Sequence, residues 1–115
     1  MREDVEAAAV NEVVLVGRVS QAPVERSLPS GDRLWTFRIV VPRPEGRGRG
    51  ASVDALECAA WAGRARRTVA GWRAGDLVRV SGAVRRRFFR SAGGAASRVE
   101  VEVTAAKLIR RGVTS

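Results

Sequence analysis

The sequence contains no histidine, and Cys58 is its only cysteine. Without histidine the chain lacks the most common general base, the most common ligand of transition metals and any nucleophile that an imidazole would activate. A single cysteine excludes an intrachain disulfide and a cysteine metal cluster. The acidic residues show no convincing pairing for carboxylate catalysis. We therefore expect a protein that is not an enzyme and that uses no metal or cofactor.

Long apolar segments are absent as well. No apolar run approaches the roughly 18 residues that cross a bilayer, and the first ten residues carry acids instead of the apolar core of a secretory signal. With 45% hydrophobic and 29% charged residues, the chain fits one soluble globular domain. We expect it in the cytoplasm, without membrane association.

Acidic residues are few relative to basic ones, and the formal net charge is +9. From Cys58 to Val99 the only acid is Asp76, against ten arginines, so the basic charge is concentrated. Such a field favours a polyanionic partner such as nucleic acid. A second explanation stays open, because all but one of the 21 basic residues are arginine, which a GC-rich genome also produces.

Strand patterns occupy five segments. Alternating or clustered β-branched and aromatic residues predict strands at about 13–19, 33–41, 53–61, 77–89 and 98–103. Gly17 and Gly82 interrupt the first and fourth segments and predict bends or bulges. In the fifth segment we expect the valines to face the core and the glutamates to face solvent.

One short helix is expected between the third and fourth strands. Ala65, Val69 and Trp72 fall at helical spacing and give an apolar stripe over residues 64–72. Three strands, a helix and two strands match the five-stranded OB-fold barrel, an all-β architecture. A split ferredoxin-like sheet would need two helices.

The domain boundaries follow from this reading. We expect a flexible leader at residues 1–10, the OB-fold domain at 11–109 and a short tail at 110–115. The glycine-rich segment 44–50 predicts a mobile loop that carries Arg47 and Arg49.

Five short motifs follow one another along the predicted domain. They are Asn11-Glu-Val-Val-Leu-Val-Gly17, Pro23 with Arg26 and the Pro29-Ser30-Gly31 turn, Cys58-Ala-Ala-Trp61, Gly75-Asp-Leu-Val-Arg-Val-Ser-Gly82 and Arg85-Arg-Arg-Phe-Phe89. In this order and at these intervals they resemble the bacterial single-stranded DNA-binding protein family, over about residues 11–109.

The resemblance implies sequence-tolerant binding and protection of single-stranded DNA in replication, recombination or repair, in association with the nucleoid. It also implies a homo-oligomer, dimer or tetramer, and the open apolar edge at residues 13–16 is consistent with one. An RNA-binding OB domain and a primosome-type protein–protein adaptor stay open as alternatives. A nuclease would lack histidine and any clear acidic metal cluster.

Aromatic rings and arginines are the side chains that unpaired bases and phosphates need. The resemblance makes Phe89 the first stacking candidate, and its neighbour Phe88 is then expected in the core on the opposite face. The reverse assignment of these two residues stays open. Trp61 and Trp35 are further candidates, each with a core position as the alternative, whereas Trp72 is expected in the core. The hairpin arginines have no compensating acid beside them, which favours a phosphate path. The arginine candidates are Arg85, Arg86, Arg87, Arg90 and Arg98 at the hairpin, Arg18, Arg38 and Arg79 in the groove, and Arg47 and Arg49 in the loop.

Three departures from the family pattern are visible. Pro42-Arg-Pro44 has no aromatic residue where the family has a loop tryptophan, and Leu56 stands at the position of a third-strand tryptophan. The chain ends without the family's acidic tail. We therefore expect weaker stacking, more reliance on charge and no tail-mediated recruitment of repair enzymes.

Overall fold

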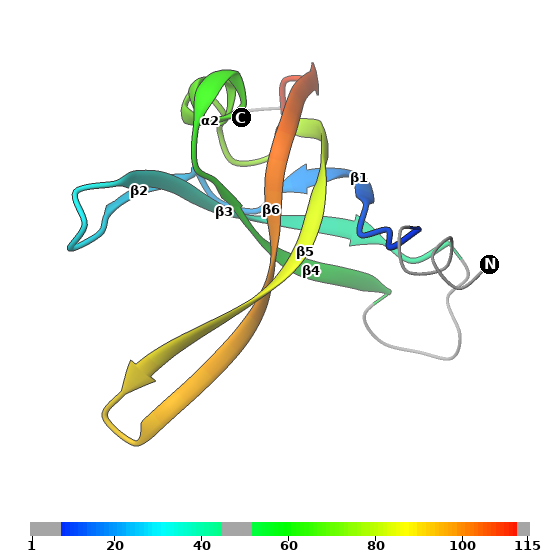
Figure 1. Ribbon diagram of the computed structural model, residues 1–115. Helices are drawn as coiled ribbons and strands as arrows, with labels where there is room; N and C mark the ends of the chain where they lie inside the picture. Colours follow the sequence, from blue (N-terminus) through cyan, green and yellow to red (C-terminus); the bar gives the residue numbers. More distant parts are fainter. Residues whose placement is uncertain (1–7, 45–51, 113–115) are drawn as a thin grey trace.

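The computed structural model describes residues 8–44 and 52–112 (Figure 1). The elements in chain order are β1 (Val13–Val19), β2 (Val24–Ser27), β3 (Arg33–Pro42), β4 (Val53–Ala60), α2 (Gly63–Ala70), β5 (Leu77–Ser91) and β6 (Gly94–Arg110). Within these residues, no helix has the length and apolar character that crossing a membrane would require. Arg47 and Arg49, and the leader residues before 8, lie outside the described residues.

Five of the strands close into a barrel. They are paired in the order β1-β5-β6-β4-β3, and β3 returns to pair with β1. The pairings are antiparallel except for β4 with β6, which are parallel. Helix α2 lies at one end of the barrel, between β4 and β5 in the chain (Figure 1). The predicted five-stranded OB-fold barrel is confirmed, with one short helix in the described residues at the predicted place in the chain.

The additional strand β2 was not predicted from the sequence. Among the described strands it pairs only with β3, from Val24 opposite Thr36 to Ser27 opposite Arg33. All four β2 residues are exposed, so they give no alternating pattern of buried side chains. Strand β2 therefore forms a hairpin arm with β3 beside the barrel, and this arm is one wall of the site described below.

The core fills the barrel and the underside of α2. Phe37 and Ile39 of β3 are buried, and the Phe37 ring meets the Trp72 ring edge to face at 5.4 Å between centroids. Ala65 and Val69 are buried on the helix, as the apolar stripe predicts. Trp72 is only 4% exposed, which confirms its predicted core position.

Two glycines allow strands to approach more closely than a side chain would permit. At Gly82 the β5–β6 register shifts, and a Cβ atom there would lie 1.8 Å from the carbonyl oxygen of Glu102. The predicted irregularity is therefore present at Gly82. At Gly17 the β1–β5 register is continuous, but a Cβ atom would lie 2.3 Å from the carbonyl oxygen of Val40. Gly17 thus permits the contact between β1 and β3.

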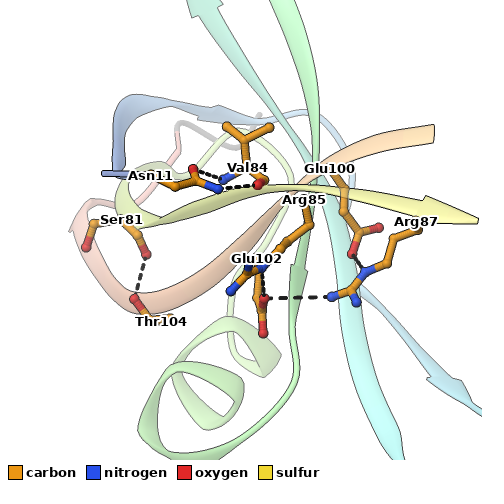
Figure 2. Close-up of polar contacts among 8 residues, drawn as sticks. All are labelled: Asn11, Ser81, Val84, Arg85, Arg87, Glu100, Glu102 and Thr104. Atoms are coloured by element: carbon orange, nitrogen blue, oxygen red, sulfur yellow. Dashed lines mark hydrogen bonds and ion pairs between the residues drawn. The ribbon is translucent and has the colours of Figure 1, made fainter. Parts of the chain in front are cut away.

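Asn11, the first residue of the opening motif, extends the β1–β5 pairing by one step through its side chain. Its Nδ2 donates to the carbonyl oxygen of Val84 at 2.7 Å, and the Val84 amide donates to its Oδ1 at 2.9 Å (Figure 2). An amide side chain carries an N–H donor and a carbonyl acceptor side by side, so it can replace a backbone peptide group here. This is why an asparagine suits the position.

Strands β5 and β6 continue past the barrel as a long hairpin arm (Figure 1). Because no core lies beneath this arm, Phe88 is 76% exposed and its predicted core position is wrong. The predicted alternation in β6 is wrong at two positions. Val99 is 50% exposed for the same reason, whereas Glu100, beside Arg87 and Arg98, is only 6% exposed.

The far end of β6 is tied to the turn before β5 by a buried carboxylate. Asp76 is 1% exposed and accepts hydrogen bonds from the amides of Arg73 and Gly112 and from Arg111 Nη1, at 2.7–2.9 Å. Burial alone would raise the pKa of Asp76, but these hydrogen bonds and the Arg111 charge outweigh it and hold the pKa below its ordinary value. Residues 110–112 therefore belong to the folded domain and not to the predicted tail.

Candidate nucleic-acid interface

A cleft of about 340 Å³ lies between the β2–β3 arm and the β5–β6 arm. We call it the hairpin cleft. It combines two aromatic rings, three arginines, one acid and a small apolar floor. Its lining residues are Arg26, Leu28, Leu34, Thr36, Trp61, Arg87, Phe89, Arg98 and Glu100.

The two aromatic rings of the hairpin cleft come from distant parts of the chain. Trp61 follows the last residue of β4 and is half-buried, and Phe89 lies near the end of β5 and is 44% exposed. The predicted exposure of Phe89 is confirmed. The fold brings both rings to one cleft because β4 and β5 both pair with β6.

Each ring carries an arginine. The guanidinium carbon of Arg87 lies 5.0 Å from the centre of the Trp61 ring, and that of Arg98 lies 5.7 Å from the centre of the Phe89 ring. Both distances are within the range of a cation–π contact. Arg87 and Arg98 are directly opposite each other in the β5–β6 register, so both point to the face of the arm that lines the cleft.

Three of the five hairpin arginines, Arg85, Arg87 and Arg98, are paired with acids, contrary to the sequence-based expectation. Arg87 Nε donates to Glu100 Oε2 at 3.0 Å, and Arg98 Nε lies 3.7 Å from Glu100 Oε1. Arg85 Nε donates to Glu102 Oε1 at 2.7 Å, and Arg87 also lies 3.8 Å from Glu102 (Figure 2). Glu100 and Glu102 follow Arg87 and Arg85 by 13 and 17 positions in the chain and meet them only across the hairpin, so these two pairings were overlooked. Glu100 also stands two residues after Arg98 on the same strand.

The five hairpin arginines also divide between two faces. Arg85, Arg87 and Arg98 share the face that carries Phe89, whereas Arg86 and Arg90 lie on the reverse face with Phe88. Arg86 donates to Ser97 Oγ at 3.1 Å. A single phosphate path over all five is therefore not what the arm presents.

The groove candidates on the barrel strands differ in how far they are engaged. Arg38 Nε donates to Glu57 Oε2 at 2.7 Å, and both line a second hollow of about 330 Å³ that shares Arg26 and Thr36 with the hairpin cleft. Arg18 donates to the carbonyl oxygen of Gly75 at 2.9 Å.

Four of the predicted arginines have no acidic partner among residues 8–44 and 52–112. Arg18 and Arg86 donate to Gly75 and Ser97 instead, and Arg79 and Arg90 are exposed on β5.

Trp35 lies away from the hairpin cleft. Its side chain is half-buried and packs against the core cluster, on the same face of β3 as Phe37 and Ile39. This placement agrees with the core alternative that the sequence left open.

Within the described residues, no three acidic or cysteine side chains lie close enough together to hold a metal ion.

Several residues of the hairpin cleft were not singled out in the sequence. Arg26, Leu28, Leu34 and Thr36 belong to the arm built on β2, which has no readable pattern. Glu100 had a usable signal. Counting outward from a two-residue turn at 92–93 places it across from the arginines of β5.

Comparisons with known proteins place these features in a family. The sequence model of the Single-strand binding protein family matches residues 10–109. Single-stranded DNA-binding protein 3 of Listeria innocua serovar 6a is 34% identical over 86 residues, which is 74% of this chain and 54% of that protein. The Single-stranded DNA-binding protein of Oceanobacillus iheyensis is 33% identical over 86 residues, 74% of this chain and 53% of that protein.

A third relative, the Single-stranded DNA-binding protein of Halalkalibacterium halodurans, is 31% identical over 81 residues, 70% of this chain and 48% of that protein. The chain spans about half the length of the curated relatives it matches. The match to the family model covers the whole barrel and both arms. On this evidence, the chain belongs to the single-strand binding protein family.

Proposed function

We propose that this protein binds single-stranded DNA, without catalysis and with little dependence on base sequence, in the hairpin cleft. The observation that carries the proposal is that one cleft holds two aromatic rings, Trp61 and Phe89, each with an arginine against it. The printed names of the three relatives, all single-stranded DNA-binding proteins, support it.

The physical basis is that an unpaired base exposes a flat π-face and its backbone carries one charge per nucleotide. Stacking of a base on an aromatic side chain contributes about 1–3 kcal/mol and does not depend strongly on which base stacks. Arginine supplies both a charge for phosphate and a plane for stacking. Duplex DNA hides the base faces, so this arrangement favours single strands.

Further arginines extend the proposed path. Arg26 stands in the wall of both hollows, where its Nε donates to Thr36 Oγ1 at 3.2 Å, and Arg38 continues from it. Arg18 and Arg79 on the barrel, and Arg86 and Arg90 on the reverse face of the arm, are proposed as weaker contacts to neighbouring phosphates. Trp35 would contribute least, because the core occupies most of its surface.

The proposed role is to hold and protect transient single strands in replication, recombination or repair, at the nucleoid in the cytoplasm. We also propose a dimer or tetramer. Val14 and Val16 on β1 are 54% and 45% exposed, and among the described strands residues 13–17 of β1 pair only with β5. Sedimentation equilibrium tests this assembly, and a monomer at all concentrations would contradict it.

The function is tested by titrating the protein with fluorescent oligo-dT, oligo-rU and a duplex of equal length, at low salt. We expect the tightest binding to oligo-dT, with quenching of tryptophan emission from Trp61. Tighter binding to oligo-rU would favour the RNA-binding alternative. Weak binding to all three would favour a protein–protein adaptor and would contradict the proposal.

A further inference from the structure

We infer that Glu100 competes with the DNA backbone for the arginines of the hairpin cleft. In the free protein its carboxylate binds these arginines, and a bound DNA strand must displace it. The inference rests on the proposed function and adds an affinity-determining residue to that site. Glu100 is the one acid in the cleft lining and the most deeply buried charged group of the β5–β6 arm.

The carboxylate of Glu100 occupies two of the three cleft arginines. Its two oxygens are divided between them, with Oε2 at 3.0 Å from Arg87 Nε and Oε1 at 3.7 Å from Arg98 Nε. A phosphate also presents several anionic oxygens to guanidinium groups, so it would compete for the same donors. Glu100 is only 6% exposed, so it cannot turn into solvent while this arrangement persists.

The same two arginines also cover the rings. Arg87 lies over Trp61 and Arg98 lies over Phe89, so one face of each ring is occupied by a cation that Glu100 holds in place. A base that stacks on that face must move the arginine, and a phosphate that draws the arginine away uncovers the ring. Phosphate binding and base stacking are therefore coupled through one carboxylate.

How far the two arginines are exposed to solvent determines the effect of removing the charge of Glu100. The side chains of Arg87 and Arg98 are 37% and 59% exposed, so without Glu100 their charges remain solvated and free to meet phosphate. Removing Arg87 instead would take away the shorter of the two ion pairs of a buried carboxylate, which is destabilising. Glu100→Gln is therefore the informative substitution.

The experiment compares Glu100→Gln with Asp54→Asn by binding to oligo-dT over a series of salt concentrations. Asp54 pairs with Arg43 at 2.8 Å, and neither lines the cleft, so this control makes the same change in net charge elsewhere. We expect Glu100→Gln to tighten binding about tenfold, the equivalent of freeing one charge-assisted hydrogen bond. The log–log salt slope should become steeper by about 0.7–1.4, for one or two additional phosphates. For Asp54→Asn we expect about a twofold effect at most and an unchanged slope.

Several outcomes would overturn the inference. Equal tightening in both variants would mean that only net charge matters, and weaker binding by a folded Glu100→Gln protein would mean that Glu100 positions the arginines for DNA. Should Glu100→Gln fail to fold by circular dichroism, Glu102→Gln provides the second test, because Glu102 holds Arg85 and approaches Arg87. We expect a smaller tightening there, and none would contradict the inference. If the unmodified protein fails to bind oligo-dT at all, the proposed function itself fails, which is a separate result.

Discussion

The guanidinium of Arg98 lies 5.7 Å from the centre of the Phe89 ring, and the two side chains reach each other diagonally across the β5–β6 arm. Strand alternation puts Phe89 on the cleft face, and Arg98 contacts its ring there although no hydrophobic core lies beneath the arm. Phe88 has no such contact with any residue that the structure describes, and it is 76% exposed on the reverse face. Two adjacent phenylalanines thus differ in environment, which makes them a matched pair for mutagenesis.

We predict that Phe89→Ala weakens binding to oligo-dT by about 1–3 kcal/mol, because it removes a stacking surface from the hairpin cleft. Phe88→Ala, which removes the same side chain from the reverse face, should weaken binding less. Both variants should keep the thermal stability of the parent, because neither ring is in the core. Fluorescence anisotropy measures the affinities. A larger loss of affinity for Phe88→Ala would mean that bases stack on the reverse face of the arm and would contradict the prediction.

A second prediction concerns salt. Arginine contacts to phosphate release counterions, so the logarithm of the affinity for oligo-dT should fall with the logarithm of salt concentration, by about 0.7 for each phosphate neutralised. Titrations at four or more salt concentrations give the slope. An affinity that does not change with salt would remove the arginine–phosphate contacts from the proposal while leaving stacking possible.

A third prediction concerns Asp76. Its pKa is lowered in the folded protein, so its contribution to stability is present above the ordinary pKa of about 3.9 and is lost as the pH falls through the folded-state value. Asp76→Asn should lower the free energy of unfolding at pH 7 by about 1.5–3 kcal/mol, the range for hydrogen bonds to a charged group. Arg111 is half-exposed and stays solvated, which limits the loss.

Urea denaturation of both proteins as a function of pH tests this. The difference between them should shrink as the pH falls below about 4. A difference that stays constant over the whole pH range would show that the charge of Asp76 is not what matters.

A fourth prediction concerns the single thiol. Cys58 is 2% exposed, and burial, together with the charges of Glu57 and Glu100, raises its pKa to about 12. The reactive thiolate is therefore scarce at neutral pH. A disulfide reagent should label the native protein only as fast as it unfolds, and the denatured protein at once. Rapid labelling without denaturant would contradict the buried position.

A fifth prediction uses two glycines as a pair. Gly82→Ala should lower the free energy of unfolding by more than about 3 kcal/mol, because the new Cβ would lie 1.8 Å from a backbone carbonyl oxygen of β6 that cannot easily move. Gly93→Ala at the tip of the arm meets nothing within 4 Å and should be close to neutral. Thermal denaturation distinguishes the two, and equal effects would contradict the close approach at Gly82.

The barrel could be predicted because the burial of one face of each element leaves a periodic pattern of apolar residues in the sequence. Phe37 and Ile39 alternate with polar neighbours, and Ala65, Val69 and Trp72 repeat at helical spacing, since in each case one face meets the core. Strand β2 was not predicted because all its residues are exposed. A strand without a buried face leaves no period in the sequence.

The site was predicted in part. Phe89 and Trp61 were found through the motif resemblance, and the fold places both in one cleft. Glu100 was assigned to solvent because alternation with buried valines assumes a core beneath the strand, and on the arm there is none. Its burial comes from the arginines that surround it, and that contact depends on a register between residues far apart in the chain.

Because the β5–β6 arm extends past the barrel, residues that contact a ligand on the arm are distinct from residues that stabilise the fold. Side chains beyond the barrel make no core contacts, so exchanging them alters what the arm touches and leaves the folding of the barrel almost unaffected. A chimaera that carries the arm tip of a relative on this barrel should therefore fold normally and acquire the donor's preference among ligands.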